Sequence, residues 1–455
     1  VKPFKNQYVY LGYYSGKQLP VVDSAKLNDK SEGVFKGTKK LGGGIYLIGY
    51  PDKNGFFELL IDKQQKFSVI ADTSTLRTNG ISFINSPDNV LFNAYQQAMS
   101  AKGKDIEAVK QQLAAAKTKS DSTRLNEELA RLDKDMRQYR ENLIKKNPDN
   151  ILSTFLVAMR EPVLPDSLKN PASKKDSVIA YNYFKDHFWD GVNFWDGRLA
   201  RTPSSLFEAK LDKYFDELVV PHPDSVIKEI DWMLGYASPD EEMTKFLLLK
   251  FVNRYLNQKY MWEDAVFVHL FEKYFSNKNY SWLNDKGRKT ISDRAYSLMA
   301  NITGTAASDI ELPDTAGKEL TLFSQTAPYT IVCFWDPTCG HCKEIVPQLD
   351  SMYRNKWKAA GIKMFAVAKE TDGTKKDWLS FIHEHSLQDW ANVYYSKAEE
   401  KARTDAGVPG YSQLYDVQTF PTLYLLDKDK RIVAKKLTFQ QIDEILQLKQ
   451  KGSNN

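Results

Sequence analysis

The first part of the chain alternates between short apolar runs and turn residues. β-branched and aromatic residues are concentrated at 8–11, 44–48, 56–61 and 67–71, with turn-forming residues such as Lys53-Asn54-Gly55 between them. Short β-rich runs that are separated by Gly, Asn and Asp are typical of an antiparallel sandwich or meander. The pattern predicts an antiparallel, β-sandwich-like domain over residues 1–86.

The periodicity becomes helical at Ser86-Pro87-Asp88-Asn89, which is a helix-start signal. Between residues 125 and 143, apolar side chains recur every three or four positions and line one face of a helix. We interpret Ser120-Asp121-Ser122 as the turn of a helical hairpin, and Asn147-Pro148-Asp149 as the start of the next helix. Residues 87–302 are therefore predicted to form an all-helical domain of several antiparallel helices.

After a small, polar linker at Thr303-Gly304-Thr305, predicted strands alternate with predicted helices. The expected elements are a hairpin at 309–322, a buried strand at 329–335, a helix to about 358, a strand at 362–368, a helix at 375–385, a hairpin at 423–434 and a last helix at 439–449. This alternation predicts a C-terminal α/β domain over 303–455. The whole chain is expected to be multidomain, as its 455 residues also suggest.

Composition narrows the classes of partner. Apolar residues make up 42% and charged residues 27%, as in soluble globular proteins, and the net charge is only +5. No basic tract carries interleaved aromatics, so nucleic acid is not a favoured partner. No run approaches the roughly 18 apolar residues of a membrane helix. The chain shows no signal peptide and begins within an apparent strand, so we expect that a targeting or anchoring segment has been removed. Membrane association is expected only through such an anchor.

Two of the three cysteines form the motif Cys339-Gly340-His341-Cys342. A disulfide between positions i and i+3 needs a tight backbone turn, such as the start of a helix. There Cys339 would face unpaired amides and the positive end of the helix dipole, which favour its thiolate. Cys342 would lie one turn inside and be more buried. We expect Cys339 to attack and Cys342 to resolve, with protonated His341 further stabilising the thiolate.

Other interpretations of the dithiol fit less well. A zinc site needs a second Cys/His pair, but the third cysteine, Cys333, stands alone and His383 and His385 lie on a charged segment. No metal and no cofactor are therefore predicted. A peroxiredoxin would need Thr three residues before its reactive Cys, where this chain has Asp336. A structural, inert dithiol remains as an alternative.

The context of the motif carries a family resemblance. Residues 330–343, Thr-Ile-Val-Cys-Phe-Trp-Asp-Pro-Thr-Cys-Gly-His-Cys-Lys, resemble the active-site stretch of the TlpA/ResA-like thiol–disulfide oxidoreductases of bacterial cell envelopes. Trp335, Pro347 and the segment Thr419-Phe420-Pro421-Thr422 match the family's tryptophan, helix-kinking proline and cis-proline. The resemblance covers about 150 residues and implies a thioredoxin fold for 303–455.

The resemblance also implies roles for individual residues. Pro421 is expected to be cis and to lie beside Cys339, with the backbone of Phe420 pairing with an incoming peptide. Trp335, Phe420 and Thr419 are expected to contact the substrate. Two positions depart from the family. Cys333 replaces the buried acid that relays protons in thioredoxin, and we interpret it as an inert core thiol.

The second departure concerns a glutamate that the family often carries three residues after the second cysteine. This chain has Ile345 there and Glu344 beside it. Glu344 is a candidate for proton transfer, although an exposed helix carboxylate is the favoured interpretation.

The predicted activity is reduction or isomerisation of disulfides in client proteins, with an upstream redox partner, in the periplasm or cell envelope. The alternative is an envelope protein whose upstream modules bind a partner or ligand, such as a glycan, and whose thioredoxin domain is a docking module. Those modules resemble uncharacterised ones in large envelope redoxin proteins, at 86–92 and 188–190. Trp189, Trp195 and Arg198, in a duplicated Phe-Trp-Asp-Gly pattern, are a candidate ligand surface, but a loop packed on the core is favoured.

Overall fold

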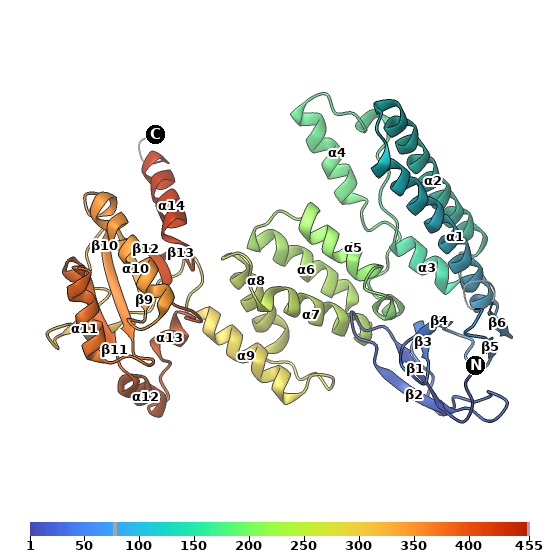
Figure 1. The fold of residues 1–455 in the computed structure, drawn as a ribbon, viewed down its shortest axis with the longest axis horizontal. Coiled ribbons are helices and arrows are strands. Elements are labelled where there is room, and N and C mark those ends of the chain that lie inside the picture. Colours follow the sequence, from blue (N-terminus) through green and yellow to red (C-terminus); the bar gives the residue numbers. More distant parts are fainter. Residues whose placement is uncertain (76–79, 453–455) are drawn as a thin grey trace. The chain divides into compact units, whose positions relative to one another are not determined.

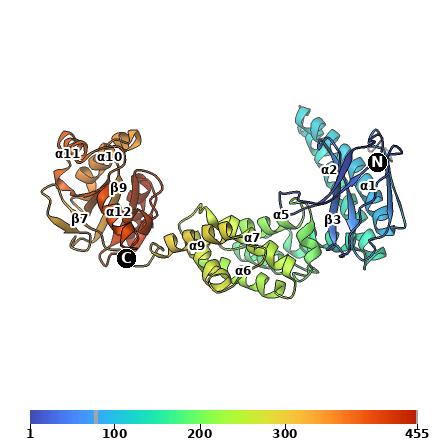
Figure 2. The same cartoon turned by 90° about the horizontal axis from the view of Figure 1, so that it is seen from below.

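The computed structural model describes residues 1–75 and 80–452. Two compact units make up the chain (Figures 1 and 2). The first contains Val1–Pro221 and Lys228–Leu249, and the second contains His222–Ile227 and Lys250–Asn455. Helix α6 (Pro223–Ala237) and helix α7 (Glu241–Leu256) each contribute residues to both units.

The first unit begins with an antiparallel sheet, as the sequence predicted. The strand order is β2-β1-β3-β4, and a separate hairpin pairs β5 with β6. The strands are β1 (Tyr8–Tyr13), β2 (Val21–Lys26), β3 (Gly44–Gly49), β4 (Phe56–Ile61), β5 (Ser68–Ala71) and β6 (Ile81–Ile84). Alternate side chains of β1 and β4, such as Val9, Leu11, Leu59 and Ile61, form one buried cluster.

Helix α1 (Pro87–Ala115) is bonded to strand β4 through the side chains of Asn89 and Gln96, and Asn89 makes the buried contact. The amide of Asn89 accepts a hydrogen bond from the backbone N–H of Leu60 at 2.6 Å and donates one to the carbonyl of Leu60 at 2.8 Å. The side chain therefore pairs with β4 as the backbone of a neighbouring strand would.

The α1–α2 connection corrects one prediction. Helix α2 (Lys119–Lys146) pairs with α1 as a long hairpin, but the turn lies before Lys119 and not at 120–122 (Figure 1). Thr118 is the N-cap of α2 and accepts a hydrogen bond from the backbone N–H of Asp121. Asp121 thus belongs to the first helical turn, where a carboxylate is favoured by the helix dipole.

The remaining helices confirm the predicted central helical region. Asn150 caps α3, close to the predicted start at 147–149. The helices are α3 (Ile151–Ala158), α4 (Lys174–Asp186), α5 (Phe207–Lys213), α6, α7, α8 (Glu263–Leu270) and α9 (Asp285–Met299). Within the described residues, no helix is long and apolar enough to span a membrane.

The second unit contains a five-stranded mixed sheet in the order β11-β10-β9-β12-β13. Strands β9, β10 and β11 are parallel, whereas β12 runs antiparallel to both β9 and β13. The strands are β9 (Tyr329–Trp335), β10 (Lys363–Lys369), β11 (Ala391–Tyr395), β12 (Thr422–Asp427) and β13 (Ile432–Lys435). Each predicted strand of this region is present, and β11 is an additional one.

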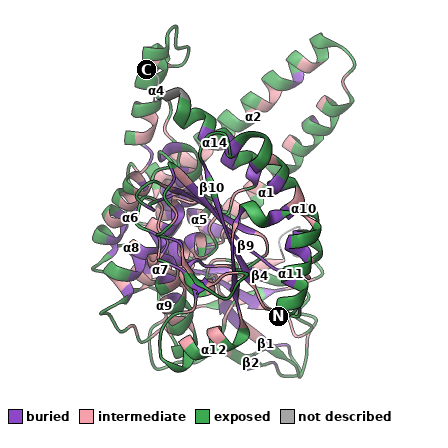
Figure 3. Ribbon diagram, turned by 90° about the vertical axis from the view of Figure 1, so that its left-hand side faces the viewer, coloured by how far each residue is buried: buried purple, intermediate pink, exposed green. Residues whose placement is uncertain are grey.

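The central strands of this sheet are buried (Figure 3). Both faces are covered, because side chains of β9 belong alternately to two cores. Ile331, Cys333 and Trp335 face helices α10 (Gly340–Met352), α11 (Lys375–Glu384) and α14 (Phe439–Gly452). Val332 and Phe334 face the hairpin of β7 (Glu311–Pro313) and β8 (Glu319–Thr321) and the short helix α13 (Tyr411–Leu414). This arrangement confirms the predicted C-terminal α/β domain of thioredoxin type.

The compact unit that holds this sheet extends beyond the predicted domain 303–455, because it also includes residues 250–302. A buried contact joins residues 250–302 to the sheet. Lys435 Nζ on β13 donates to the carbonyl and the side-chain oxygen of Asn301, each at 2.6 Å. The domain boundaries at 86 and 302 stay predictions.

Candidate active site

Cys339 occupies the start of helix α10. It is the N-cap residue, with its backbone N–H directed to the carbonyl of Asp336 at 3.3 Å and its own carbonyl accepting from Lys343 N–H at 3.1 Å. The residue is partly exposed, and Gly340 and His341 after it are exposed. The sequence prediction that Cys339 lies at a helix start is confirmed.

Cys342 lies one turn into the helix and is fully buried. The pKa of its thiol is raised to about 12, mainly by burial and in smaller part by the charge of the adjacent Cys339 and a side-chain hydrogen bond with it. A backbone hydrogen bond from Asp336 opposes the rise of this pKa. Cys342 is therefore protonated near neutral pH, while Cys339 is the accessible sulfur of the pair.

The third cysteine is confirmed as a buried core thiol. Cys333 lies on β9 with no exposed surface, and burial raises its pKa well above the ordinary value, with a further contribution from nearby Cys342. A thiol of this kind reacts slowly because little thiolate forms.

The sequence analysis missed one residue of the site, Asp336. Its carboxylate is buried and accepts hydrogen bonds from the backbone N–H and the hydroxyl of Thr338, each at 2.7 Å, and from the hydroxyl of Thr371. Asp336 thus fixes the turn before Cys339 and joins it to the loop after β10. Its negative charge also raises the pKa of Cys342. The signal in the sequence is Asp-Pro-Thr, because Asp often accepts from the backbone N–H two residues later.

The cis-proline segment lies across a cavity from the helix start. The Phe420–Pro421 peptide bond is cis, as the resemblance implied. A cavity of about 390 Å³ is lined by His341, Thr419 and Pro421 together with residues of 436–440. The segment 419–421 precedes Thr422, where the pairing of β12 with β9 begins. The structure thus brings three of the predicted site residues together around one cavity.

The side chains of two other predicted residues, Trp335 and Phe420, do not line this cavity. Trp335 is completely buried, with its ring 4.9 Å from that of Phe381, so its predicted contact with substrate stays untested and its position is that of a core side chain. Phe420 is half-buried and packs against both cores of the sheet. Glu344 is exposed on α10.

Across the described residues, no group of His, Cys, Asp or Glu has the arrangement of a metal site.

Comparisons with known proteins agree with this geometry. Residues 303–435 match the family described as "AhpC/TSA family", and residues 108–298 match a "Domain of unknown function (DUF5106)". The thiol-disulfide oxidoreductase ResA of Bacillus cereus is 25% identical over 147 residues, which are 32% of this chain and 76% of that protein.

Two solved structures are also similar. A domain of a "possible thiol-disulfide isomerase" from Cytophaga hutchinsonii is 31% identical, over 33% of this chain and 95% of that one, with a TM-score of 0.29. A thioredoxin-like protein from Bacteroides caccae is 19% identical, over 64% of this chain and 98% of that one, with a TM-score of 0.45.

The fold, the site and the sequence matches define the class: the C-terminal part of this chain is a thioredoxin-fold oxidoreductase. Within that class, this part of the chain resembles the TlpA/ResA-like thiol–disulfide oxidoreductases. Its helical region matches a family without an assigned function.

Proposed function

We propose that the chain reduces or isomerises disulfides of client proteins through Cys339 and Cys342. The supporting observation is the asymmetry of the pair. Cys339 is partly exposed at a helix start, whereas Cys342 is buried with a pKa raised to about 12. A nucleophile must reach its substrate, and a resolving thiol must be held away from competing reactions.

The proposed exchange proceeds in two steps. The Cys339 thiolate attacks one sulfur of the client disulfide, forms a mixed disulfide and releases the other client sulfur as a thiolate. Cys342 then loses its proton and attacks Cys339, which releases the second client thiol and leaves a Cys339–Cys342 disulfide. The client gains two electrons and the enzyme loses two. A dithiol protein upstream is required to return the pair to the reduced form.

The cavity beside Pro421 supports a peptide substrate. Thr419 is exposed and Pro421 half-buried at its edge, and residues 419–421 lie outside the β12–β9 ladder. We propose that an extended client segment pairs with the backbone at Phe420, with Thr419 and Pro421 shaping the groove and His341 at its opposite side. By its resemblance to envelope oxidoreductases, we place the protein in the periplasm or cell envelope.

This function can be tested with a disulfide-bonded test protein. The full chain is the catalyst, dithiothreitol is the reductant, and the rate of reduction is measured. We expect the wild-type chain and Cys333→Ser to accelerate reduction equally, because Cys333 is buried away from solvent. Cys339→Ser is expected to abolish the acceleration. The proposal fails if Cys339→Ser retains the wild-type rate.

A further inference from the structure

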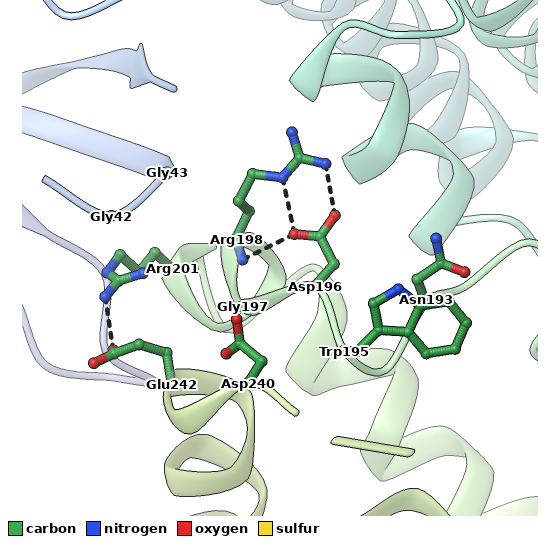
Figure 4. A pocket seen from close by; sticks show the side chains of 10 residues that line it. All are labelled: Gly42, Gly43, Asn193, Trp195, Asp196, Gly197, Arg198, Arg201, Asp240 and Glu242. Atoms are coloured by element: carbon green, nitrogen blue, oxygen red, sulfur yellow. Dashed lines mark hydrogen bonds and ion pairs between the residues drawn. The ribbon is translucent and has the colours of Figure 1, made fainter. Parts of the chain in front are cut away.

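The first unit contains a cavity that the proposed exchange reaction does not use. Its volume is about 510 Å³, within the range of ligand sites. Three segments that are distant in sequence line it: Gly42 and Gly43 before β3, residues 193–201, and Asp240 and Glu242 at the start of α7 (Figure 4). The second segment contains the second copy of the repeated Phe-Trp-Asp-Gly motif, and the first copy lies at 188–191, outside the lining.

The structure separates the two tryptophans of that motif. Trp189 packs inside an aromatic cluster, with its ring 5.1 Å from Phe194 and 5.1 Å from Tyr214. Trp195 lines the cavity and is 51% exposed (Figure 4). The favoured interpretation of a loop packed on the core therefore holds for Trp189 but not for Trp195.

Trp195 is one end of an exposed aromatic strip. Its ring lies 6.2 Å from that of Tyr236, which lies 5.3 Å from Trp232 on the previous turn of α6. Tyr236 is 49% exposed and Trp232 41% exposed. Single exposed aromatic residues are common in soluble proteins, but three in contact beside a polar cavity form a surface suited to an apolar chain.

The charges at the cavity exclude an anionic ligand. Arg198 pairs with Asp196 at 2.6 Å and with Asp62 at 3.0 Å, and Arg201 pairs with Glu242 at 2.7 Å. Both guanidinium groups are therefore already compensated. The lining holds three carboxylates (Asp196, Asp240 and Glu242) and two guanidiniums, and Asp62 behind it brings the excess to two negative charges.

Two carboxylate oxygens at the cavity are available. Asp240 Oδ1 accepts from the backbone N–H of Met243 at 2.8 Å, and Glu242 Oε2 receives Arg201. Their other oxygens, Oδ2 and Oε1, have no partner in the part of the chain that the structure describes. Residue 197 is a glycine, and a side chain would not fit there, because an added Cβ would lie 2.4 Å from Asp240 Oδ1. The glycine thus lets the carboxylate occupy its place at the cavity.

From this arrangement we propose that the cavity binds an organic cation, an ammonium or guanidinium group on an apolar chain. The head group would bind Asp240 and Glu242 and lie over the face of Trp195, while the chain would follow Tyr236 and Trp232. A positive group gains both ion-pair and cation–π energy there. The described residues supply no cluster suited to a metal ion, so an organic cation is the chemistry that matches. Its source is either a free amine or the Lys or Arg side chain of a peptide.

Isothermal titration of the full chain tests this site. Agmatine represents a free cation, and the peptide Ala-Ala-Arg-Ala-Ala, acetylated at its N-terminus and amidated at its C-terminus, represents the side chain. The same peptide with neutral citrulline, and maltotriose, are the neutral probes. We expect binding of agmatine, the Arg peptide or both, with weakening at higher salt, and no binding of the neutral probes. Binding of agmatine alone would assign a small-amine site, and preference for the peptide would assign a protein partner.

Variants locate the binding. Asp240→Asn keeps an acceptor for Met243 but removes the charge, and is expected to weaken binding at least about tenfold. Trp195→Ala is expected to weaken it too, as is Gly197→Ala, which displaces the carboxylate without changing charge. Asp224→Asn, an equal charge change at an exposed position of α6, is the control and should have no effect. Circular dichroism and thermal melting check that each variant is folded.

Three results would overturn the proposal. They are equal binding of the citrulline and arginine peptides, binding of maltotriose that Asp240→Asn leaves unchanged, and no binding of either cation. None of these measurements involves the cysteines, so failure here is distinct from failure of the exchange activity.

Discussion

The guanidinium of Arg294 on α9 lies 2.6 Å from the carboxylate of Asp416, which has no exposed surface. The second oxygen of Asp416 pairs with Lys436. Asp416 also lines the cavity that contains Pro421. A helix that precedes the thioredoxin fold is thus bound to the loop that leads to the cis-proline segment.

Breaking this ion pair is expected to destabilise the second unit. Arg294→Ala leaves the carboxylate of Asp416 buried with one cation fewer, and breaking a buried pair costs about 3–5 kcal/mol. Urea unfolding followed by circular dichroism measures the loss. Lys289→Ala removes an exposed pair with Asp293 on the same helix and is expected to cost less than about 1 kcal/mol. Equal losses in both variants would contradict the assigned role of Arg294.

Asp416 also makes stability depend on acid. Burial would raise its pKa, but hydrogen bonds from Arg294 and Lys436 outweigh burial and lower it from 3.8 to about 2. Because the folded-state pKa lies below the unfolded one, the stabilisation is complete above about pH 4 and is lost as pH falls towards 2. Its size is about 2 kcal/mol. We expect the loss of unfolding free energy between pH 4 and 2 to be smaller in Asp416→Asn, and an unchanged pH dependence would contradict this account.

Asp336 is expected to add to the low reactivity that burial gives Cys342. Its charge raises the pKa of that thiol, so Asp336→Asn should lower the Cys342 pKa and speed alkylation of Cys342 at mildly alkaline pH. Mass spectrometry after iodoacetamide treatment of the reduced protein gives the rate at each cysteine. In the wild type, Cys339 should react first and Cys333 last. Glu344→Gln, an exposed carboxylate on the same helix, is the control. The account is wrong if Glu344→Gln speeds Cys342 alkylation as much as Asp336→Asn does.

His341 is expected to make the pair more oxidising than a Cys-Gly-Pro-Cys centre. A protonated imidazole stabilises the Cys339 thiolate, and therefore the reduced form. We expect a reduction potential nearer about −180 mV than the roughly −270 mV of thioredoxin. Equilibration with glutathione measures it, and His341→Pro should lower it. A wild-type value below about −260 mV would mean that other groups outweigh the histidine.

The elements that the sequence predicted best have continuous apolar runs. Strand β9 (Tyr329–Trp335) was predicted with its observed bounds, because six of its seven residues are buried. Strand β11 (Ala391–Tyr395) was missed because Asn392 interrupts its apolar pattern. That side chain is buried and donates to the carbonyls of Leu387 and Trp390 at 2.8 and 3.1 Å. These two acceptors for its side-chain nitrogen exist only in the folded loop, so the pattern alone gave no indication of burial.

The candidate site was predicted in the same uneven way. The dithiol and Pro421 follow from local motifs, which determine a helix start and a cis bond. Asp336 was not recognised as buried because its burial depends on Thr371, a residue 35 positions away. The turn before α2 was misplaced for a local reason, since Thr118 was not recognised as the cap. In both of the missed cases, a hydrogen bond of a side chain determined the structure: that of Asp336 with Thr371, and that of Thr118 with Asp121.

The central claim is that client disulfides pass through a mixed disulfide with Cys339, which Cys342 resolves. The most direct measurement is trapping with the full chain, expressed in its own compartment, as Cys342→Ser and as Cys339→Ser. Cys342→Ser should accumulate clients attached to Cys339 that dithiothreitol releases, and the yield should fall when Pro421→Ala is added. Cys339→Ser should trap none. If Cys342→Ser captures no partner above the Cys339→Ser control, the account of disulfide exchange is contradicted.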